Sequence, residues 1–522
     1  MSSLIRKERK LMKERKNFVE ALETQNKKRK TLTENFAVAY ETSGKELLDF
    51  NFKLSQFRTM EENAIKHRFS AVFFEDPLIA TKFVFYVGDV RGGLGERKVF
   101  RACFDWLVEN KPEVAEALLP VIPEYTRWDN LTRLASNKKI KAAVMKVISA
   151  QLSEDIVNMS QKKPISLLAK WMPSENASSP ATKALATEIR TGLEMKPRAY
   201  RKTLSSLRKY LDITEVKVSA NNWNKIKYEA VPSQANLKYK NAFMKHDADR
   251  RKEYLESLKK GEAKINAGTL QPHEIVHKYN GNSWWSELND YDETLEQLWK
   301  NLPSIMTEDT LVVRDGSGSM TCTFGNSMLT CLDVATALAV YCAEHNSEEW
   351  RDKFITFSSR PKFINMSKCK SLRDKLKLCY EQSECSNTDI QATMELILNT
   401  AKRNGFTQDE MPSNILIISD MQFDAHRGYG FNWNKSLFEK IAAEYELAGY
   451  KLPKIIFWNV AARNSDTIPM QDNELGLILC SGFSVNNMKM FMTGEIDPYK
   501  ILLEQINVER YTKIEELVKE IL

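Results

Sequence analysis

Residues 311–320 read LVVRDGSGSM, in which a short apolar run passes directly into a turn of Asp, Gly and Ser. Alternate residues of this turn, Asp315, Ser317 and Ser319, place one carboxylate and two hydroxyls on a common side. The next segment opens a predicted helix, so backbone N–H groups also point toward the turn. Hard cations such as Mg²⁺ take oxygen ligands of this kind and keep several waters. The stretch therefore predicts a strand that ends at a divalent-cation site.

From about residue 308 onward, short apolar runs alternate with helical patterns. The predicted strands are Leu311–Val313, Phe354–Phe357, Ile415–Ile418, Ile455–Trp458 and Leu477–Cys480. Strands that are apolar throughout and separated by helices indicate a parallel sheet covered on both faces. We therefore predict a doubly wound α/β (Rossmann-like) domain over residues 305–522, with ligands at the carboxyl ends of its strands.

Two further segments of this domain carry acid and hydroxyl side chains at the same kind of place. Ser386-Asn387-Thr388-Asp389 precedes a predicted helix, and Ile417-Ile418-Ser419-Asp420 closes an apolar strand. Together with the first turn, they resemble the metal-ion-dependent adhesion site of the von Willebrand factor A (vWA) superfamily, over roughly residues 305–510. The resemblance implies five metal-site residues, which are Asp315, Ser317, Ser319, Thr388 and Asp420.

The vWA resemblance also implies the chemistry of this site. The hydroxyls of Ser317, Ser319 and Thr388 are implied ligands, with the two acids binding directly or through water. The metal is Mg²⁺, or Mn²⁺ or Ca²⁺ in its place, and one position stays open for a carboxylate from a protein partner. Arg314 departs from the family pattern, where the strand end is apolar, and we expect it to pair with a neighbouring acid. The alternative is a vWA fold whose metal only stiffens the loops.

The first part of the chain has a different pattern. Between residues 36 and 304, apolar side chains recur at three- and four-residue spacing, as at Phe100, Phe104 and Leu107. This spacing is typical of helices and shows little of the alternation expected of strands. A long series of short helices predicts an all-α, HEAT-like helical-repeat domain over residues 36–304, after a basic arm at residues 1–35.

The net charge of +7 is divided unevenly along the chain. Residues 1–30 carry 11 Lys and Arg against 4 Asp and Glu, and residues 196–264 carry 18 against 8. Residues 265–522 carry 25 against 36. A basic half beside an acidic half suggests contact with nucleic acid on the basic side, because phosphate binding scales with the cations presented. The alternative is an ordinary solvated helical surface.

Within residues 196–264, aromatic side chains are interleaved with cations. The aromatics are Tyr200, Tyr210, Trp223, Tyr228 and Tyr239. Cations that follow phosphates beside rings that stack on bases are what single-stranded nucleic acid requires. Taken singly, most of these aromatics have a core position as the alternative. The predicted RNA-binding residues are Arg91, Arg97, Arg198, Arg201, Lys202, Arg208, Lys225 and Lys227.

Several stretches carry a closer resemblance. They are RGGLGER at 91–97, PEYTRWDN at 123–130, ISLLAKWMP at 165–173, SDMQF at 419–423 and IFWN at 456–459. Together they resemble the family called domain of unknown function 2828, over most of residues 80–510. That family is similar to the Ro autoantigen (TROVE-module) proteins, which join HEAT-like helical repeats to a vWA domain. The resemblance implies binding of structured or non-coding RNA, although fold alone does not fix function.

Catalytic motifs are weak in this sequence. His273-Glu274-Ile275-Val276-His277 fits the zinc-protease pattern HExxH, but Pro272 marks a helix start there and no third ligand follows. Gly92, Gly93 and Gly95 lack the Lys-Ser/Thr of a phosphate loop, and we expect them to form a tight connection between helices. No nucleophile or general base is identifiable, so we expect no enzyme.

Cysteine usage and hydropathy indicate the compartment. The 8 cysteines show no CxxC pairing, which favours reduced thiols and an intracellular, cytoplasmic protein. No apolar run is long enough to span a bilayer, so we expect no membrane contact. The predicted function is an RNA-binding scaffold with a divalent-metal vWA site. The alternative is a protein–protein adhesion or assembly factor that uses the metal site and has no RNA role.

Overall fold

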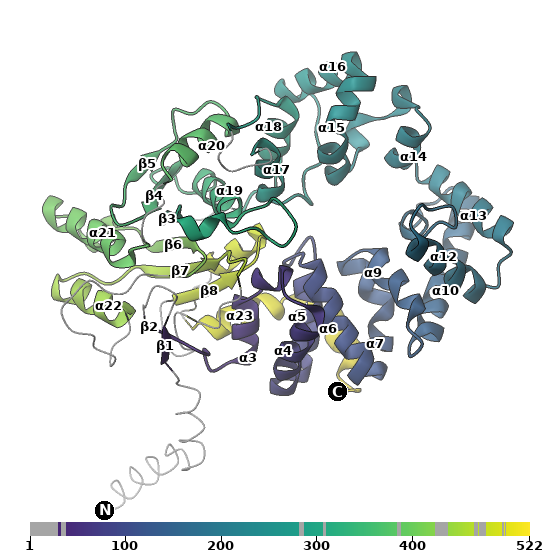
Figure 1. The fold of residues 1–522 in the computed structure, drawn as a ribbon, viewed down its shortest axis with the longest axis horizontal. Coiled ribbons are helices and arrows are strands. Elements are labelled where there is room, and N and C mark those ends of the chain that lie inside the picture. The colour runs from purple at the N-terminus through teal and green to yellow at the C-terminus, as the bar shows by residue number, and fades with distance from the viewer. Residues whose placement is uncertain are drawn as a thin grey trace, which may run out of the picture.

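The computed structural model describes residues 30–32, 38–280, 287–305, 309–383, 388–422, 437–463, 468, 477–492, 495 and 497–522. Along the chain, a helical part comes first and a part built on a mixed sheet follows it (Figure 1). This order confirms the predicted succession of a helical and an α/β region. Residues 1–29 of the predicted basic arm lie outside the described residues.

The sheet part contains six strands in the order β5-β4-β3-β6-β7-β8. Their bounds are β3 (Thr310–Asp315), β4 (Lys353–Phe357), β5 (Phe363–Asn365), β6 (Asn414–Ser419), β7 (Lys454–Asn459) and β8 (Leu477–Ser481). All five predicted strands are present and pair in parallel, with Val313 beside both Ile355 and Ile417. The short edge strand β5, which pairs antiparallel with β4, was not predicted. Its burial alternates, with Ile364 buried between two exposed neighbours, so it lacks an apolar run.

Helices cover both faces of this sheet. Their bounds are α19 (Cys331–Glu344), α20 (Leu372–Glu381), α21 (Ile390–Asn404), α22 (Leu437–Leu447) and α23 (Pro498–Ile506). The last helix of the described residues, α24 (Thr512–Val518), packs on the helical part instead. The chain runs through α19 from β3 toward β4 and through α21 back toward β6, in opposite directions along the sheet. Right-handed crossovers therefore place α19 and α21 on opposite faces. Thr330 and Asp333 form a capping box that starts α19.

The helical part consists of helices of very different length, from 4 residues in α11 to 20 in α10. The bounds are α3 (Glu46–Phe52), α4 (Glu62–Glu75), α5 (Pro77–Gly88), α6 (Arg97–Asn110), α7 (Pro112–Leu118), α8 (Ile122–Tyr125), α9 (Trp128–Thr132), α10 (Lys141–Ser160), α11 (Leu168–Trp171), α12 (Pro180–Gly192), α13 (Pro197–Tyr210), α14 (Thr214–Ser219), α15 (Ser233–His246), α16 (Ala248–Lys259), α17 (Pro272–Tyr279) and α18 (Glu293–Lys300). A two-stranded ribbon, β1 (Lys30–Leu32) with β2 (Val38–Tyr40), precedes them and was not predicted. The predicted helical repeat remains a prediction.

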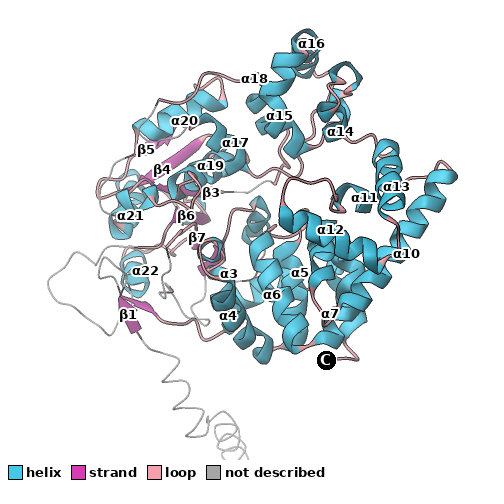
Figure 2. Cartoon of the chain, turned by 45° about the vertical axis from the view of Figure 1, so that its right-hand side comes forward, coloured by secondary structure: helices cyan, strands magenta, loops and turns pink. Residues whose placement is uncertain are grey.

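The helices follow an arc that starts and ends at the sheet part (Figures 1 and 2). At its start, Nδ2 of Asn459 at the end of β7 donates to the Phe52 carbonyl at 2.8 Å, and the Ser55 N–H donates to Ser481 Oγ at 3.0 Å. At its end, Nδ2 of Asn280 donates to Oδ1 of Asp333 at the start of α19 at 2.5 Å. The arc is therefore closed against the sheet part at both ends.

Helices α23 and α24 close the arc a second time, because they pack on α5 and α7 (Figure 1). Asp89 is buried and accepts hydrogen bonds from Arg510 Nη2 at 2.9 Å and the Tyr511 hydroxyl at 3.1 Å. Lys82 Nζ lies 3.0 Å from a Glu515 carboxylate oxygen. Residues 498–518, predicted within the α/β domain, thus join the sheet part to the helical part.

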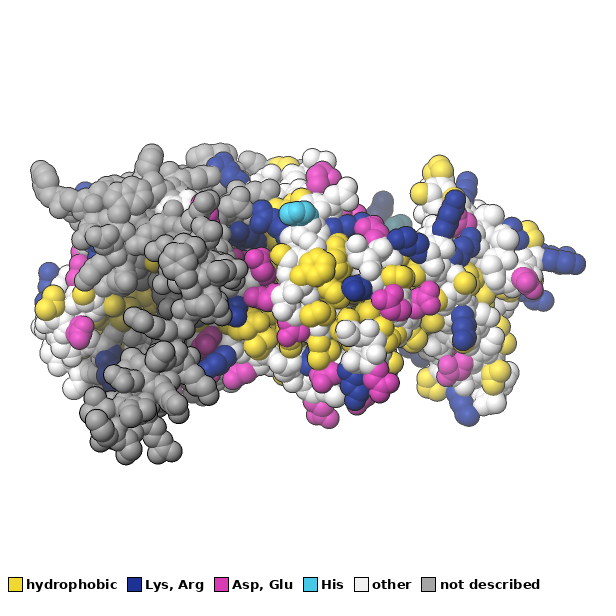
Figure 3. Space-filling view, turned by 90° about the horizontal axis from the view of Figure 1, so that it is seen from below, with side chains coloured by type: hydrophobic (Ala, Val, Ile, Leu, Met, Phe, Trp, Pro, Cys, Tyr) yellow, Lys and Arg dark blue, Asp and Glu magenta, His cyan; other side chains and the backbone are white. Residues whose placement is uncertain are grey.

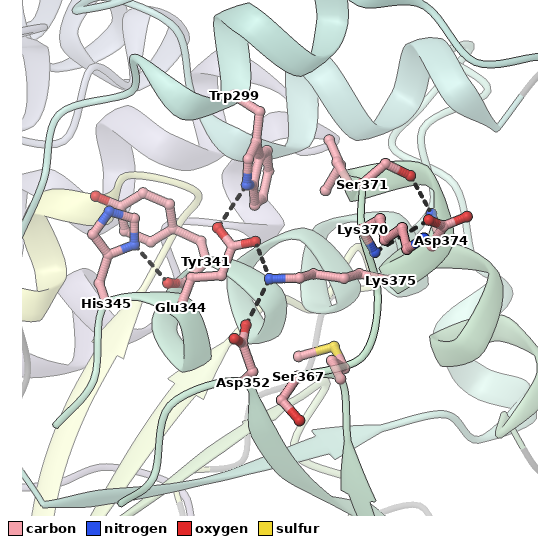
Figure 4. Close-up of polar contacts among 12 residues, drawn as sticks. Trp299, Tyr341, Glu344, His345, Asp352, Ser367, Lys370, Ser371, Asp374 and Lys375 are labelled. Atoms are coloured by element: carbon pink, nitrogen blue, oxygen red, sulfur yellow. Dashed lines mark hydrogen bonds and ion pairs between the residues drawn. The ribbon is translucent and has the colours of Figure 1, made fainter. Parts of the chain in front are cut away.

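The junction of α18 with α19 and α20 contains a network of ion pairs (Figure 4). Lys375 Nζ lies 2.7 Å from a Glu344 carboxylate oxygen and 2.6 Å from one of Asp352. Trp299 Nε1 donates to the other Glu344 oxygen at 2.7 Å. Lys375 and both acids are mostly buried, so each acid depends on this one cation. The last helix of the arc is therefore tied to the sheet part through Glu344.

The glycines at 92–95 form the tight connection that the sequence predicts between α5 and α6. A Cβ on Gly93 would lie 1.9 Å from the Tyr86 carbonyl oxygen, which no other residue tolerates. Gly95 has φ +67, the left-handed region that glycine adopts without strain. The Gly93 carbonyl then accepts hydrogen bonds from Ser484 and Asn486, so this connection also contacts the sheet part. Of the described helices, none is both long and apolar enough to cross a membrane.

Candidate functional site

The carboxyl ends of β3 and β6 bring the first predicted metal-site residues together. These strands are parallel neighbours, so Asp315 and Ser419 finish at the same edge of the sheet. The Ser419 hydroxyl donates to Asp315 Oδ2 at 2.6 Å, and the Ser317 N–H donates to Asp315 Oδ1 at 2.9 Å. The Ser317 and Ser319 hydroxyls lie 3.0 Å apart. The turn thus holds one carboxylate and two hydroxyls side by side.

Thr388 and Asp420 form the second half of the site. The Thr388 hydroxyl donates to the Gln422 carbonyl at 2.7 Å, and the Gln422 N–H lies 3.3 Å from Asp420 Oδ1. Thr388 and Asp420 are buried, as are Asp315 and Ser317, whereas Ser319 is half-buried and Gly318 is exposed. Among the described residues of this group, Gly318 and Ser319 therefore form the side that faces solvent.

The two acids of the site interact with each other. Burial, and then repulsion from Asp420, raise the pKa of Asp315 to about 7, while the hydrogen bond from Ser419 opposes the rise. Burial and the charge of Asp420 also hold the pKa of the Cys331 thiol well above its usual range. Two neighbouring buried carboxylates favour a bound cation, because its charge would offset both their repulsion and their loss of hydration.

The donor set fits a hard cation. All five predicted ligands offer oxygen, which Mg²⁺ and Ca²⁺ prefer over nitrogen and sulfur. In the described part of the chain, no three or more His, Cys, Asp or Glu side chains are grouped to hold a metal. The set has two carboxylates and three hydroxyls, so water and a ligand from outside would complete its coordination.

Arg314, next to Asp315, is fully buried and differs from expectation. Its Nη1 donates to the Thr336 hydroxyl at 3.0 Å, and its Nη2 donates to the Cys379 carbonyl and the Ser383 hydroxyl, both at 2.9 Å. The predicted pairing with an acid is not found among the described residues, where Arg314 bonds to neutral oxygens instead. Arg314 thereby fixes the end of β3 to the end of α20.

The predicted RNA-binding cations divide into exposed side chains and side chains that bond to neighbouring groups. Arg91, Arg198, Lys202, Lys225 and Lys227 are exposed. Lys and Arg side chains project at the end of the molecule that α10, α12 and α13 form (Figure 3). Arg201 lies 3.1 Å from a Glu175 carboxylate oxygen. Arg208 donates to the carbonyls of Ala169 at 2.8 Å and Met172 at 2.7 Å, so its guanidinium holds α11 in place.

Arg97 belongs to a cluster of side chains that was not predicted from the sequence. The guanidinium groups of Arg97, Arg101 and Arg127 all contact Asp129 Oδ2, that of Arg101 at 3.1 Å and that of Arg127 at 2.9 Å. Burial, and then repulsion from Arg97 and Arg133, lower the pKa of Arg101 to about 10. Arg127 also stacks over the Trp171 ring at 4.4 Å.

We call Arg97, Arg101, Arg127 and Asp129 the arginine cluster. Three positive charges surround one carboxylate, so the cluster keeps an excess of positive charge at a partly exposed position. Guanidinium groups held in fixed directions suit the paired oxygens of a phosphate. The i, i+4 spacing of Arg97 and Arg101 in α6 was a signal for this cluster in the sequence.

Two of the five interleaved aromatics are core residues. Tyr200 and Tyr228 are buried, and their hydroxyls bond to the Pro173 carbonyl and the Asp247 carboxylate, both at 2.8 Å. Trp223 stacks on the His246 ring at 4.6 Å. Tyr210 is exposed, and its hydroxyl donates to the Lys163 carbonyl. The stacking platform for bases expected from the sequence is therefore not formed by Tyr200 or Tyr228.

The HExxH stretch has structural contacts in α17. His273 is buried, with its ring 4.8 Å from that of Phe483, and burial holds its pKa well below the usual range. Glu274 closes a capping box with Gln271 and accepts a hydrogen bond from Gln234 at 2.7 Å. His277 lies 3.7 Å from an Asp333 oxygen. These contacts place His273 in the seam between α17 and the sheet part, and they join Glu274 to the start of α17 and to α15.

Two family models match this chain, one in each part. The model described as domain of unknown function (DUF2828) matches residues 33–127 and 192–310. The model described as domain of unknown function (DUF7788) matches residues 309–519. An uncharacterized protein of Acanthamoeba polyphaga mimivirus is 29% identical over 513 residues, which is 91% of this chain and 86% of that protein. The domain of unknown function 2828 family, which the sequence motifs suggest over most of residues 80–510, is thus matched by two stretches of the helical part, whereas the sheet part matches the other model.

Proposed function

We propose that this chain is an RNA-binding scaffold whose helical part binds the phosphates of RNA. The arginine cluster is the observation that carries the proposal, because it presents three guanidinium groups around one acid. The basic balance of residues 1–264, with 51 Lys and Arg against 33 Asp and Glu, supports it. The likeness to Ro (TROVE-module) proteins, with their HEAT-like repeats and structured or non-coding RNA, agrees with this assignment.

The strand-end site is the second element of the proposal. In it, the vWA-like set of Asp315, Ser317, Ser319, Thr388 and Asp420 holds Mg²⁺ or Mn²⁺, and a protein partner supplies a carboxylate to the metal. The all-oxygen donor set and the repulsion between the two buried acids support this assignment. RNA binds elsewhere, because residues 265–522 are acidic and phosphates avoid such a surface.

An RNA shift assay across salt tests the main proposal. A chain without residues 1–29 keeps β1 and removes the nonspecific affinity of the basic arm. If 6 to 8 phosphates are neutralised, log affinity should fall against log salt with a slope of roughly −4 to −7. Absence of RNA affinity at low salt in this chain would contradict the proposal.

A double variant assigns the binding to the arginine cluster. Replacing Arg97 and Arg127 by Gln should reduce the salt slope by about 1.4 to 1.8, since each phosphate contact contributes about 0.7 to 0.9. The matched control replaces Arg351 and Arg403, two exposed arginines of the sheet part, by Gln with the same change in net charge. Arg208 is left intact, because its bonds to two backbone carbonyls hold α11.

The second candidate function is a protein–protein adhesion or assembly factor. The buried acid pair at the strand ends favours it, because such a site binds a partner acid through a metal. This function predicts metal-dependent partner binding and no RNA affinity. The RNA assay on the chain without residues 1–29 therefore separates the two candidates.

A further inference from the structure

A pocket of about 630 Å³ opens between α13, α14 and the 3₁₀ turn Trp223–Lys225. Five cations line it, which are Arg201, Arg208, Lys209, Lys217 and Lys225, against the single acid Asp212. It is separate from the arginine cluster, which shares none of these residues. The strand-end site contributes none of the lining residues either.

The charge of this pocket is only partly compensated. Arg201 lies 3.1 Å from Glu175, and Lys217 lies 2.7 Å from Asp212. The bonds of Arg208 go to two backbone carbonyls, and burial lowers the pKa of this guanidinium. Lys209 and Lys225 are exposed, without an ion pair among the described residues. Three cations around the pocket therefore lack a carboxylate partner, and an anion bound there would supply the missing charge.

Part of the pocket lining is apolar, and we call this part the floor. Leu204 and Ile213 are buried in it, and Val216 is exposed beside them. A lone phosphate ion would leave this floor and most of the volume uncovered, whereas ligand pockets of this size enclose most of a small organic molecule. The side-chain amides of Asn176 and Asn222 add hydrogen-bond donors and acceptors to the lining. The ligand that fits has an anionic head and a flat body with polar edges.

We propose that this pocket binds a nucleoside monophosphate group, with the phosphate near Arg208, Lys209 and Lys225 and the base over Leu204, Ile213 and Val216. The group is either a free nucleotide or the phosphorylated end of an RNA, and the second case rests on the proposed RNA-binding function. In that case the pocket binds the phosphorylated end of an RNA, while the arginine cluster binds phosphates within the same RNA. Recognition of the terminal phosphate distinguishes the two kinds of RNA contact.

Calorimetric titration of the full-length chain with AMP, adenosine and inorganic phosphate tests the pocket itself. AMP should bind at least about tenfold more tightly than adenosine or phosphate, since only AMP uses both the cations and the floor. Replacing Lys209 and Lys225 together by Ala should weaken AMP by about tenfold or more. The matched control replaces Lys245 and Lys252 by Ala, because both are exposed, lie on α15 and α16, and do not line the pocket.

RNA decamers with a 5′ or 3′ phosphate, compared with unphosphorylated decamers, identify the source of the ligand. A preference for phosphorylated ends that the Lys209/Lys225 variant loses supports the RNA end, and AMP binding without such a preference supports the free nucleotide. Equal AMP affinity in the pocket variant and its control overturns the inference, as does tighter binding of a phosphopeptide than of AMP. RNA affinity that persists without any AMP binding overturns the inference and leaves the proposed function intact. The reverse result, AMP binding without RNA affinity, overturns the proposed function alone.

Discussion

Replacing Asp315 by Asn removes one of the two acids at the strand ends and keeps the acceptor for the Ser317 N–H. In the metal-free protein, burial and repulsion from Asp420 raise the pKa of Asp315 from 3.8 to about 7. The folded chain therefore holds this proton more tightly than the unfolded chain does. Stability from this group is fully present below about pH 4 and is lost as the pH rises to about 7.

The magnitude follows from the difference between the two pKa values. A shift from 3.8 to about 7 corresponds to about 4 kcal/mol at pH 8. The Asp315→Asn variant is free of this penalty and loses about 1 to 2 kcal/mol because Ser419 no longer donates to a carboxylate. At pH 8 without metal, we expect the variant to be about 2 to 3 kcal/mol more stable than the wild type.

Mg²⁺ or Mn²⁺ should cancel this difference in stability. A metal present at 100 times its dissociation constant stabilises the wild type by about 2.7 kcal/mol. The effect should be smaller at pH 5.5, because protons compete with the metal for the acids. The Asp315→Asn variant should gain little at either pH. Urea unfolding of the wild type and the variant at pH 5.5 and pH 8, with EDTA or with metal, measures these differences in stability.

Glu395→Gln serves as the control, since Glu395 is an exposed acid of the same sheet part. Its unfolding should match that of the wild type at each pH and metal concentration. Equal metal-dependent stabilisation of the wild type and the Asp315→Asn variant would refute the site. A wild-type stability that does not change between pH 5.5 and pH 8 in EDTA would refute the electrostatic reasoning.

Three further substitutions test other parts of the structure. Lys375→Ala leaves Glu344 and Asp352 without their shared cation. Urea unfolding at pH 7 should show that the free energy of unfolding falls by about 2 to 4 kcal/mol, and a fall below about 0.5 kcal/mol would count against this network. Burial raises the pKa of Asp49 to about 6. The free energy of unfolding of the wild type should therefore fall by up to about 3 kcal/mol as the pH rises from 4 to 6. If the assignment is right, Asp49→Asn should flatten this part of the stability profile. Asp89→Asn weakens the contacts with Arg510 and Tyr511. Limited proteolysis should then cut residues 498–522 faster than in the wild type. An unchanged cutting rate would mean that α24 is held by its apolar contacts alone.

The sheet was predictable because its central strands carry a strong local signal. Each of the five predicted strands is buried along nearly its whole length, so its sequence is continuously apolar. Strand β5 and the ribbon β1–β2 have only three residues per strand, too few for a period to show. The return of residues 498–518 to the helical part depends on contacts such as Lys82 with Glu515, which no local pattern encodes.

The candidate sites were predictable to different degrees. The turn at Asp315 and the end of β6 could be combined because parallel neighbours end at one edge of a sheet, and the structure places both acids there. For the predicted RNA-binding cations, only their number and their positions along the chain could be read from the sequence. How many of its N–H groups a guanidinium can offer to a ligand depends on its neighbours in space, and Arg208 donates to two carbonyls that lie 39 and 36 residues away in sequence. For the same reason the convergence of Arg101 and Arg127 on Asp129 was missed.

The double closure of the arc has a consequence for how the chain is made. Asp89 is synthesised some 420 residues before Arg510 and Tyr511, its partners. At about 5 to 20 residues per second, a ribosome needs about 20 to 80 seconds to cover that distance. During this time α5 has its neighbours α4 and α6 but lacks α23 and α24. A nascent chain of this kind therefore exposes apolar helix surface until residues 498–518 have been translated, and we expect it to be a client of chaperones that bind such surfaces at the ribosome.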